Sequence, residues 1–223
     1  MSAQGRKALL FFAALAALVA VGGVLANRLL RFAAGPEAEI LTALKQTERV
    51  PLRVQVEGTP EPLVSSRHAY DRVVVDLDPD GKGARVTATL DFVGHFGVTQ
   101  VSSLGLERIR WQRAEDEWIA PEGVAPLLAR VVGILERRRR ALERGDAAAL
   151  AALGDGEESL LEVSNRQYQA RAWYIRTERD QVLITEEYRL IGQRGDRAVD
   201  ESGARRLVLR ERRGQFLFSA ELR

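Results

Sequence analysis

Residues 85–93 read RVTATLDFV and residues 181–190 read QVLITEEYRL. One register of the first stretch holds Val86, Ala88, Leu90 and Phe92, and one register of the second holds Val182, Ile184, Glu186, Tyr188 and Leu190. Successive side chains of a β-strand point to opposite faces, so a period of two marks a strand with one face in the core. Both stretches are therefore predicted to be half-buried strands.

Similar patterns continue on either side of these strands. Further strands are predicted at residues 52–56, 72–77, 107–113, 117–120, 171–179, 205–212 and 215–220, and helices at residues 37–49, 126–144 and 147–153. Gly145 is a natural end for the long helix, and Asp146 is a natural N-cap for the short one. Helices that are segregated from an antiparallel sheet predict an α+β fold.

The pattern also indicates an internal repeat. Adding 98 to Ile109, Trp111 and Trp118 gives Leu207, Leu209 and Phe216, and adding 96 to Val86 gives Val182. Each half then consists of a helix followed by about four antiparallel strands. The predicted halves are residues 37–122 and 123–223.

Composition excludes several kinds of site. The chain of 223 residues has no cysteine and two histidines, which excludes thiol chemistry, disulfides and cysteine-based metal centres. The net charge is +2, but residues 1–36 alone contribute +4 and the remainder carries 29 basic and 31 acidic residues. A nucleic-acid-binding domain has its basic excess on the folded part, so DNA and RNA are not expected partners.

Residues 8–26 read ALLFFAALAALVAVGGVLA and carry no charge. As a helix they would span roughly 28 Å, close to the ~30 Å hydrocarbon core of a bilayer. We expect a single-pass transmembrane helix, preceded by a short tail at residues 1–7 and followed by a linker at residues 27–36. An alternative is cleavage after Ala26, which would release a soluble secreted protein.

A family resemblance rests on the second half. Its segments are ALERGDAAALAAL (residues 141–153), ARAWYIRTER (170–179), QVLITEEYRLIG (181–192) and RRLVLRERRGQFLFSAEL (205–222). In this order they resemble the nuclear-transport-factor-like (SnoaL-like) superfamily. The resemblance implies a long helix, a short helix and a curved sheet around a cone-shaped pocket, with the first half as a degenerate copy. It also implies a choice between pocket enzymes and non-enzymatic assembly components, which fold alone does not settle.

Glu186 is the unusual member of its apolar register. If that face lines a pocket, Glu186 points inward, where desolvation could raise its pKa and make it a general base. The expected lining residues are Trp173, Tyr174, Val182, Ile184 and Tyr188. The alternative is an ion pair with an arginine such as Arg176 or Arg210.

Other motifs have simple structural interpretations. Asp76, Asp78 and Asp80 precede Gly81 and resemble the start of a calcium loop, but Thr87 stands where that loop needs Glu, and Asp-Gly also suits a hairpin turn. His68 and His95 are expected at the surface or in turns. The basic run of residues 137–140 is expected to be a solvated helix face. No cofactor is expected.

These observations favour a protein of the bacterial inner membrane that is anchored by residues 8–26. Residues 37–223 would be extracytoplasmic and act as a non-enzymatic scaffold for protein partners. The alternative is a ligand-binding or lyase- or isomerase-type domain that uses Glu186.

Overall fold

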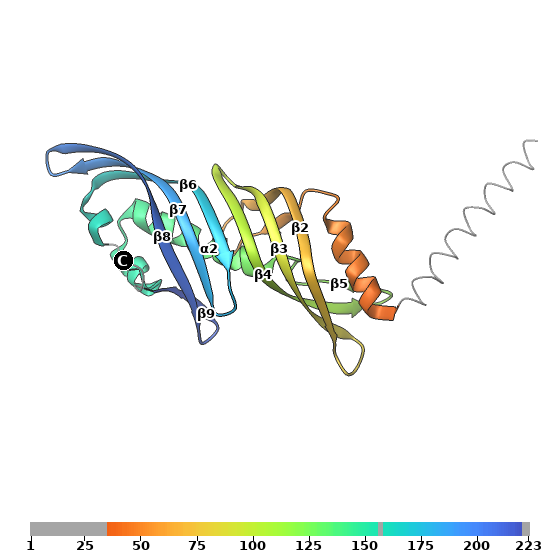
Figure 1. Ribbon diagram of the computed structural model, residues 1–223. Coiled ribbons are helices and arrows are strands. Elements are labelled where there is room, and N and C mark those ends of the chain that lie inside the picture. Colours follow the sequence, from red (N-terminus) through yellow and green to blue (C-terminus); the bar gives the residue numbers. More distant parts are fainter. Residues whose placement is uncertain (1–34, 156–157, 220–223) are drawn as a thin grey trace, which may run out of the picture. The chain divides into compact units, whose positions relative to one another are not determined.

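The computed structural model describes residues 35–155 and 158–219, and the expected anchor at residues 8–26 lies outside this part (Figure 1). The chain divides into two units, Met1–Ala43 and Leu44–Arg223, and the sheet belongs to the second unit. Within the described ranges, no helix is both long enough and apolar enough to cross a membrane.

The fold is α+β, as predicted, with a large curved sheet that does not close and few helices (Figure 1). Residues 35–47 are helical. The strands of the first part are β1 (Arg53–Gln55), β2 (Pro62–Leu77), β3 (Gly83–Phe96), β4 (Thr99–Ala114) and β5 (Glu117–Ile119). The helices α2 (Pro126–Arg144), α3 (Ala147–Ala152) and the 3-10 helix η1 (Glu158–Glu162) follow, and then β6 (Ser164–Thr177), β7 (Gln181–Arg194), β8 (Arg197–Arg212) and β9 (Gln215–Phe218).

The strand order is β1-β2-β3-β4-β6-β7-β8-β9, and β5 pairs with β4. Neighbouring strands are antiparallel except β4 and β6, which pair in parallel between Gln100–Gly105 and Ala172–Thr177. This pairing joins the two halves into one sheet. Helix α2 contacts both β4 and β6, so it spans the junction on one face of the sheet.

The alternation of apolar and polar residues in the sequence correctly predicts which side chains lie in the core. Val86, Ala88, Leu90 and Phe92 are all buried, as are Ile109, Trp111 and Trp118 in the hairpin of β4 and β5. Helix α2 begins at Pro126 and ends before Gly145, whose left-handed backbone conformation (φ 71°) terminates it. The Asp146 side chain accepts a hydrogen bond from the Ala149 N–H and caps α3, as predicted.

The strand registers of the first part match those of the second part when one offset of 98 is applied to three strands. Ala84 pairs with Trp111, and adding 98 to both residues gives Val182 and Leu209, which also pair. Adding 98 to the β4–β5 pair Gln112–Ile119 gives Arg210–Leu217, which is a β8–β9 pair. The offset of 96 expected for Val86 does not fit together with the offset of 98 expected for Ile109, because Val86 pairs with Ile109 and Leu207 pairs with Ile184 rather than with Val182.

Strands β2 and β6 correspond at an offset of 100. The β2–β3 pair His68–Phe92 becomes Tyr168–Leu190, which is a β6–β7 pair. Both strands also carry two register shifts, which in β2 lie between Ser65 and Arg67 and between Asp71 and Val74. In β6 they lie between Ser164 and Gln167 and between Ala170 and Ala172, within about two residues of the positions that an offset of 100 gives. The two four-stranded parts thus share pairing and bulges.

Candidate functional site

Glu186 lies in β7 on the face that packs against α2, and its side chain is only 1% exposed. Oε2 accepts hydrogen bonds from Nη1 of Arg138 (2.8 Å) and from the hydroxyl of Tyr168 (2.6 Å). Oε1 accepts a third hydrogen bond from Nε1 of Trp173 at 3.1 Å. Both oxygens of the carboxylate are therefore occupied by donors from α2 and β6.

Arg138 completes this buried charge network. Its side chain is fully buried, and its Nε donates to Asp155 while its Nη1 donates to Glu186. Burial alone would lower the pKa of Arg138, but the charges of Glu186 and Asp155 outweigh burial and raise it. Burial, reinforced by the charge of Glu186, raises the pKa of Tyr168. Arginine remains charged and the phenol remains protonated, so both stay hydrogen-bond donors.

The arginine partners of Glu186 differ from those expected. They are Arg138 and, at 3.5 Å, Arg205, rather than Arg176 or Arg210. The basic run at 137–140 was expected to be a solvated helix face, and this expectation is wrong for Arg138. Arg139 and Arg140 pair with Glu136 near the surface, but Arg138 points into the core. A helix turns 100° per residue, so one residue of a four-residue run faces inward.

This geometry suits a structural role for Glu186. Removing one partner of a buried ion pair leaves an uncompensated charge and is strongly destabilising. A general base needs a free oxygen within reach of a substrate proton. The three donors instead connect β7 to α2 and to β6.

The expected lining residues are divided between two faces of the sheet. Trp173, Val182 and Ile184 are buried. Tyr188 is half-buried, stacks on Tyr168 with ring centroids 5.7 Å apart, and lies 3.9 Å from the guanidinium of Arg205. Tyr174 is 42% exposed and belongs to a hollow that it shares with Leu104 and Leu183.

Glu107 is a second buried carboxylate, which the sequence reasoning did not single out. Its Oε2 and Oε1 accept hydrogen bonds from the backbone N–H groups of Leu127 (2.9 Å) and Leu128 (2.8 Å) in the first turn of α2. Burial raises its pKa to about 7 despite these two bonds. Its signal was its place two residues before Ile109, on the apolar register of β4. Adding 98 to Glu107 gives Arg205, so both halves carry a charge at this position.

The aspartate motif forms the β2–β3 turn. The Asp78 carboxylate pairs with the guanidinium of Arg110, and this contact lowers the pKa of Asp78. Asp80 accepts a hydrogen bond from the Lys82 N–H, and Asp76 is exposed at the end of β2. In the part of the chain that the structure describes, no group of three or more histidine or acidic side chains is placed to hold a metal ion.

The two histidines have different environments. His95 is exposed, as expected, but His68 is buried, which corrects the surface position expected for it. Its Nδ1 lies 3.1 Å from the Ser65 hydroxyl, and its ring meets the edge of Tyr70. Burial lowers the pKa of His68. The bulge at Ser65 and Arg67 shifts the face of the strand at this point, which a period of two does not anticipate.

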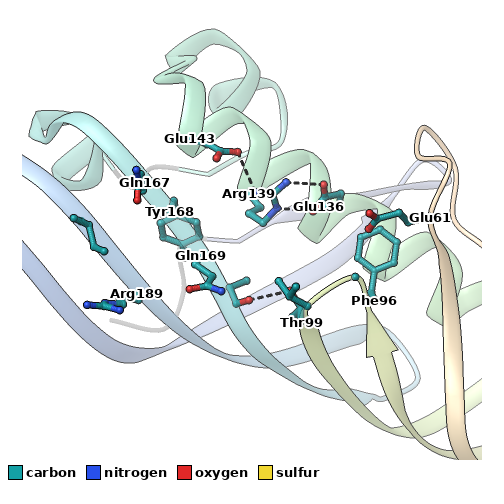
Figure 2. A pocket seen from close by; sticks show the side chains of 14 residues that line it. Glu61, Phe96, Thr99, Glu136, Arg139, Glu143, Gln167, Tyr168, Gln169 and Arg189 are labelled. Atoms are coloured by element: carbon teal, nitrogen blue, oxygen red, sulfur yellow. Dashed lines mark hydrogen bonds and ion pairs between the residues drawn. The ribbon is translucent and has the colours of Figure 1, made fainter.

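A hollow of about 520 Å³ lies where the β3–β4 turn approaches α2 and β6 (Figure 2). Arg139 donates to Glu136 and to Glu143 along its rim, and Thr99 donates to the Ala170 carbonyl across the β4–β6 junction at 2.8 Å. Burial would raise the pKa of Glu136, but its bonds to Arg139 and Arg140 outweigh burial and lower it. The two arginines therefore compensate the charge of Glu136.

A second hollow, of about 460 Å³, lies on the opposite face of the sheet. We call the residues Leu104, Tyr174 and Leu183 the outer patch. Leu104 is 56% exposed and Tyr174 is 42% exposed, and Arg176 and Arg206 border them. Exposed apolar groups that gather within a charged border are typical of protein interaction sites.

Comparison with family models and with curated proteins finds no match for this chain. Among solved structures, the chain is similar to a protein described as an "Ntf2 like protein involved in plasmid conjugation". The two share 9% identity with a TM-score of 0.30, over 72% of this chain and 77% of that one.

Proposed function

We propose that this chain is a membrane-anchored, non-enzymatic scaffold. The observation that carries the proposal is the state of Glu186, whose two oxygens are held by Arg138, Tyr168 and Trp173. The acid that best suited a general base thus fastens α2 to the sheet. The same contacts weigh against the alternative of a lyase or isomerase that uses Glu186.

The scaffold would consist of two tandem copies of a nuclear-transport-factor-like domain, residues 37–122 and 123–223. The constant offset of the strand pairs and the matching bulges of β2 and β6 support two copies of one ancestral unit. The sequence resemblance of the second half supports the choice of family. In this proposal, the parallel β4–β6 pairing fuses the copies.

The anchor would be residues 8–26, in the inner membrane of a bacterium, with residues 37–223 on the extracytoplasmic side. The uncharged stretch and its flanking basic residues support this location. Labelling tests it, because the natural chain contains no cysteine. Val98 is 82% exposed, so a membrane-impermeant maleimide should label Val98→Cys in intact spheroplasts. Labelling only after lysis would contradict the location, and recovery in the soluble fraction would contradict the anchor.

The outer patch would bind protein partners. Its apolar centre and arginine border suit a partner surface that presents apolar and acidic side chains. A photo-crosslinking amino acid at Tyr174 in intact cells should give discrete adducts, whereas the same group at Val50, which is 62% exposed, should give few. Equal patterns at both positions would contradict a specific partner surface.

A further inference from the structure

Strands β4 and β6 form the one parallel pair among the strands that the structure describes. It runs from Gln100–Ala172 to Gly105–Thr177. Val101 and Trp173 form a fully buried pair within it, whereas Ser102 and Tyr174 lie on the outer face. This is an interface between two edges that belong to different halves of the chain.

Each partner of that interface has a counterpart in the other half. Adding 98 to residues 100–105 of β4 gives residues 198–203 of β8, by the offset that relates the β3–β4 and β7–β8 pairs. Subtracting 100 from residues 172–177 of β6 gives residues 72–77 of β2. The chain therefore carries a second β4-like edge and a second β6-like edge.

Both counterpart edges lack a strand neighbour within the described ranges. Residues 198–203 of β8 pair with β7 on one side, and β9 pairs only with Leu209–Arg212. Residues 72–77 of β2 pair with β3 on one side, and β1 reaches only Pro62–Val64. Backbone groups along a free strand edge are a template for pairing with another chain.

The exposure of the β2 side chains indicates that another strand could cover this edge. Val74 is 54% exposed, and its neighbours Val73 and Val75 are half-buried. Their counterparts in β6, Trp173 and Ile175, are 0% and 3% exposed because β4 lies beside them. A run of three valines at an open edge is the pattern that soluble proteins usually avoid.

Charge favours one of two possible partner strands for the β8 edge, which are β8 of a second copy and β2 of a second copy. Asp200 and Glu201 lie side by side in β8, so pairing this edge with itself in a second copy would bring acids together. Like charges on directly opposed strands are destabilising. Pairing with β2 instead places Asp200 opposite Val74 and Glu201 opposite Val75, by the register of Ser102–Tyr174 and Ser103–Ile175.

We propose that the chain associates head to tail, with β8 of one copy paired in parallel with β2 of a second copy in the register of β4 and β6. A contact between two different edges leaves one free edge at each end, so it can continue into a ring or a filament. The interface repeats between copies what the β4–β6 pairing does within the chain. It goes beyond the scaffold role and does not depend on it.

Cysteine pairing in the full-length chain tests the register. Val74→Cys and Asp200→Cys are made as separate chains of different tag length; both side chains are more than half exposed, so folding should be retained. Adjacent strands lie about 4.8 Å apart, within the range that a disulfide spans. A mixture of the two variants under mild oxidation should give the mixed disulfide, and neither variant alone should form a dimer.

The experiment has a positive and a negative control. Ser102→Cys with Tyr174→Cys in one chain is the internal counterpart of the same pair and should close a disulfide. Val98→Cys mixed with Asp200→Cys should not cross-link. Failure of the mixture while the internal pair closes would overturn the proposal, and so would dimers of Val74→Cys or Asp200→Cys alone, which indicate self-paired edges.

Sedimentation of the full-length chain in detergent provides a second readout. The mass should rise with concentration, and Val74→Asp should abolish the rise because it places an acid opposite Asp200. Val98→Asp, the matched control at another exposed valine, should leave the rise unchanged. A monomer at every concentration would overturn the proposal.

Discussion

Nη1 of Arg138 lies 2.8 Å from Oε2 of Glu186, and the two side chains are 0% and 1% exposed. The first belongs to α2 and the second to β7, so this ion pair fixes the helix to the sheet inside the core. Tyr168 and Trp173 donate two further hydrogen bonds to the carboxylate. The packing of α2 against the buried face of the second half therefore depends on a pair of opposite charges.

Removing either charge should strongly destabilise the fold. We expect Arg138→Met to lower the free energy of unfolding by about 3–5 kcal/mol, because Glu186 and Asp155 both lose the buried arginine that they pair with. Glu186→Gln should cost less than Arg138→Met, because Arg138 keeps its pair with Asp155. Arg189→Met, which breaks the exposed Arg189–Asp200 pair, should cost less than about 1 kcal/mol. Urea denaturation measures all three. Equal effects at the buried and exposed pairs would contradict the structural role.

Glu107 should make stability depend on pH in a specific direction. Its folded-state pKa is raised from 4.5 to about 7, so the folded chain holds this proton to higher pH than the unfolded chain does. The contribution of Glu107 to stability therefore falls as pH rises from 4.5 to 7, by about 3 kcal/mol in total.

The variant Glu107→Gln isolates this contribution from the other titrating groups. The difference in unfolding free energy between the natural chain and the variant should shrink as pH rises through this window. A difference that grows with pH would show that the N–H groups of α2 hold the carboxylate in its charged form.

Two glycines should be needed at corresponding bulges of the two halves. A Cβ at Gly94 would lie 2.1 Å from the Val64 carbonyl oxygen, and one at Gly192 would lie 2.6 Å from the Ser164 carbonyl oxygen. Changing either glycine to alanine should destabilise the fold by about 1–3 kcal/mol, because backbone must move. Gly133→Ala is the control, since helical Gly133 has room for a Cβ and should gain up to about 1 kcal/mol. Thermal unfolding ranks the three variants by stability. A Gly192→Ala variant as stable as the natural chain would contradict the correspondence of the two bulges.

One buried hydroxyl adds a hydrogen bond to the strand pairing at the junction between the halves. Thr99 Oγ1 donates to the Ala170 carbonyl, so Thr99→Val should leave that carbonyl unsatisfied and cost about 1–3 kcal/mol. Thr99→Ser keeps the donor and should cost less than Thr99→Val. Chemical denaturation compares the two variants, and a valine variant as stable as the serine variant would show that the bond contributes nothing.

The sequence predicted the secondary structure and its buried face correctly wherever one hydrophobic period ran without interruption. The alternation from Val86 to Phe92 predicted the buried face of β3, and Gly145 and Asp146 predicted the boundary between α2 and α3. Strands β2 and β6 begin earlier than predicted, at Pro62 and Ser164. Their first segments are polar, and each is interrupted by a bulge, which shifts the register by one residue and hides the period.

The buried charges were harder to predict because their partners are distant in sequence. Glu186 was recognisable from its apolar register, but nothing local identifies Arg138, 48 residues away, as its partner. Four consecutive basic residues on a helix give no indication which of them faces the core until the sheet is in place. Glu107 was overlooked because the acceptor role of a helix cap normally falls to the residue that precedes the helix, here Ala125.

The central claim is that Glu186 holds the fold together and that the chain acts through its surface. The most direct measurement is photo-crosslinking at position 174 in membranes that carry either the natural chain or Glu186→Gln, at a temperature where both show cooperative unfolding and are folded. If the role of Glu186 is structural, both chains give the same adducts in the same proportions. Loss of the adducts from a folded, membrane-bound Glu186→Gln chain would contradict that role and would return Glu186 to a chemical role.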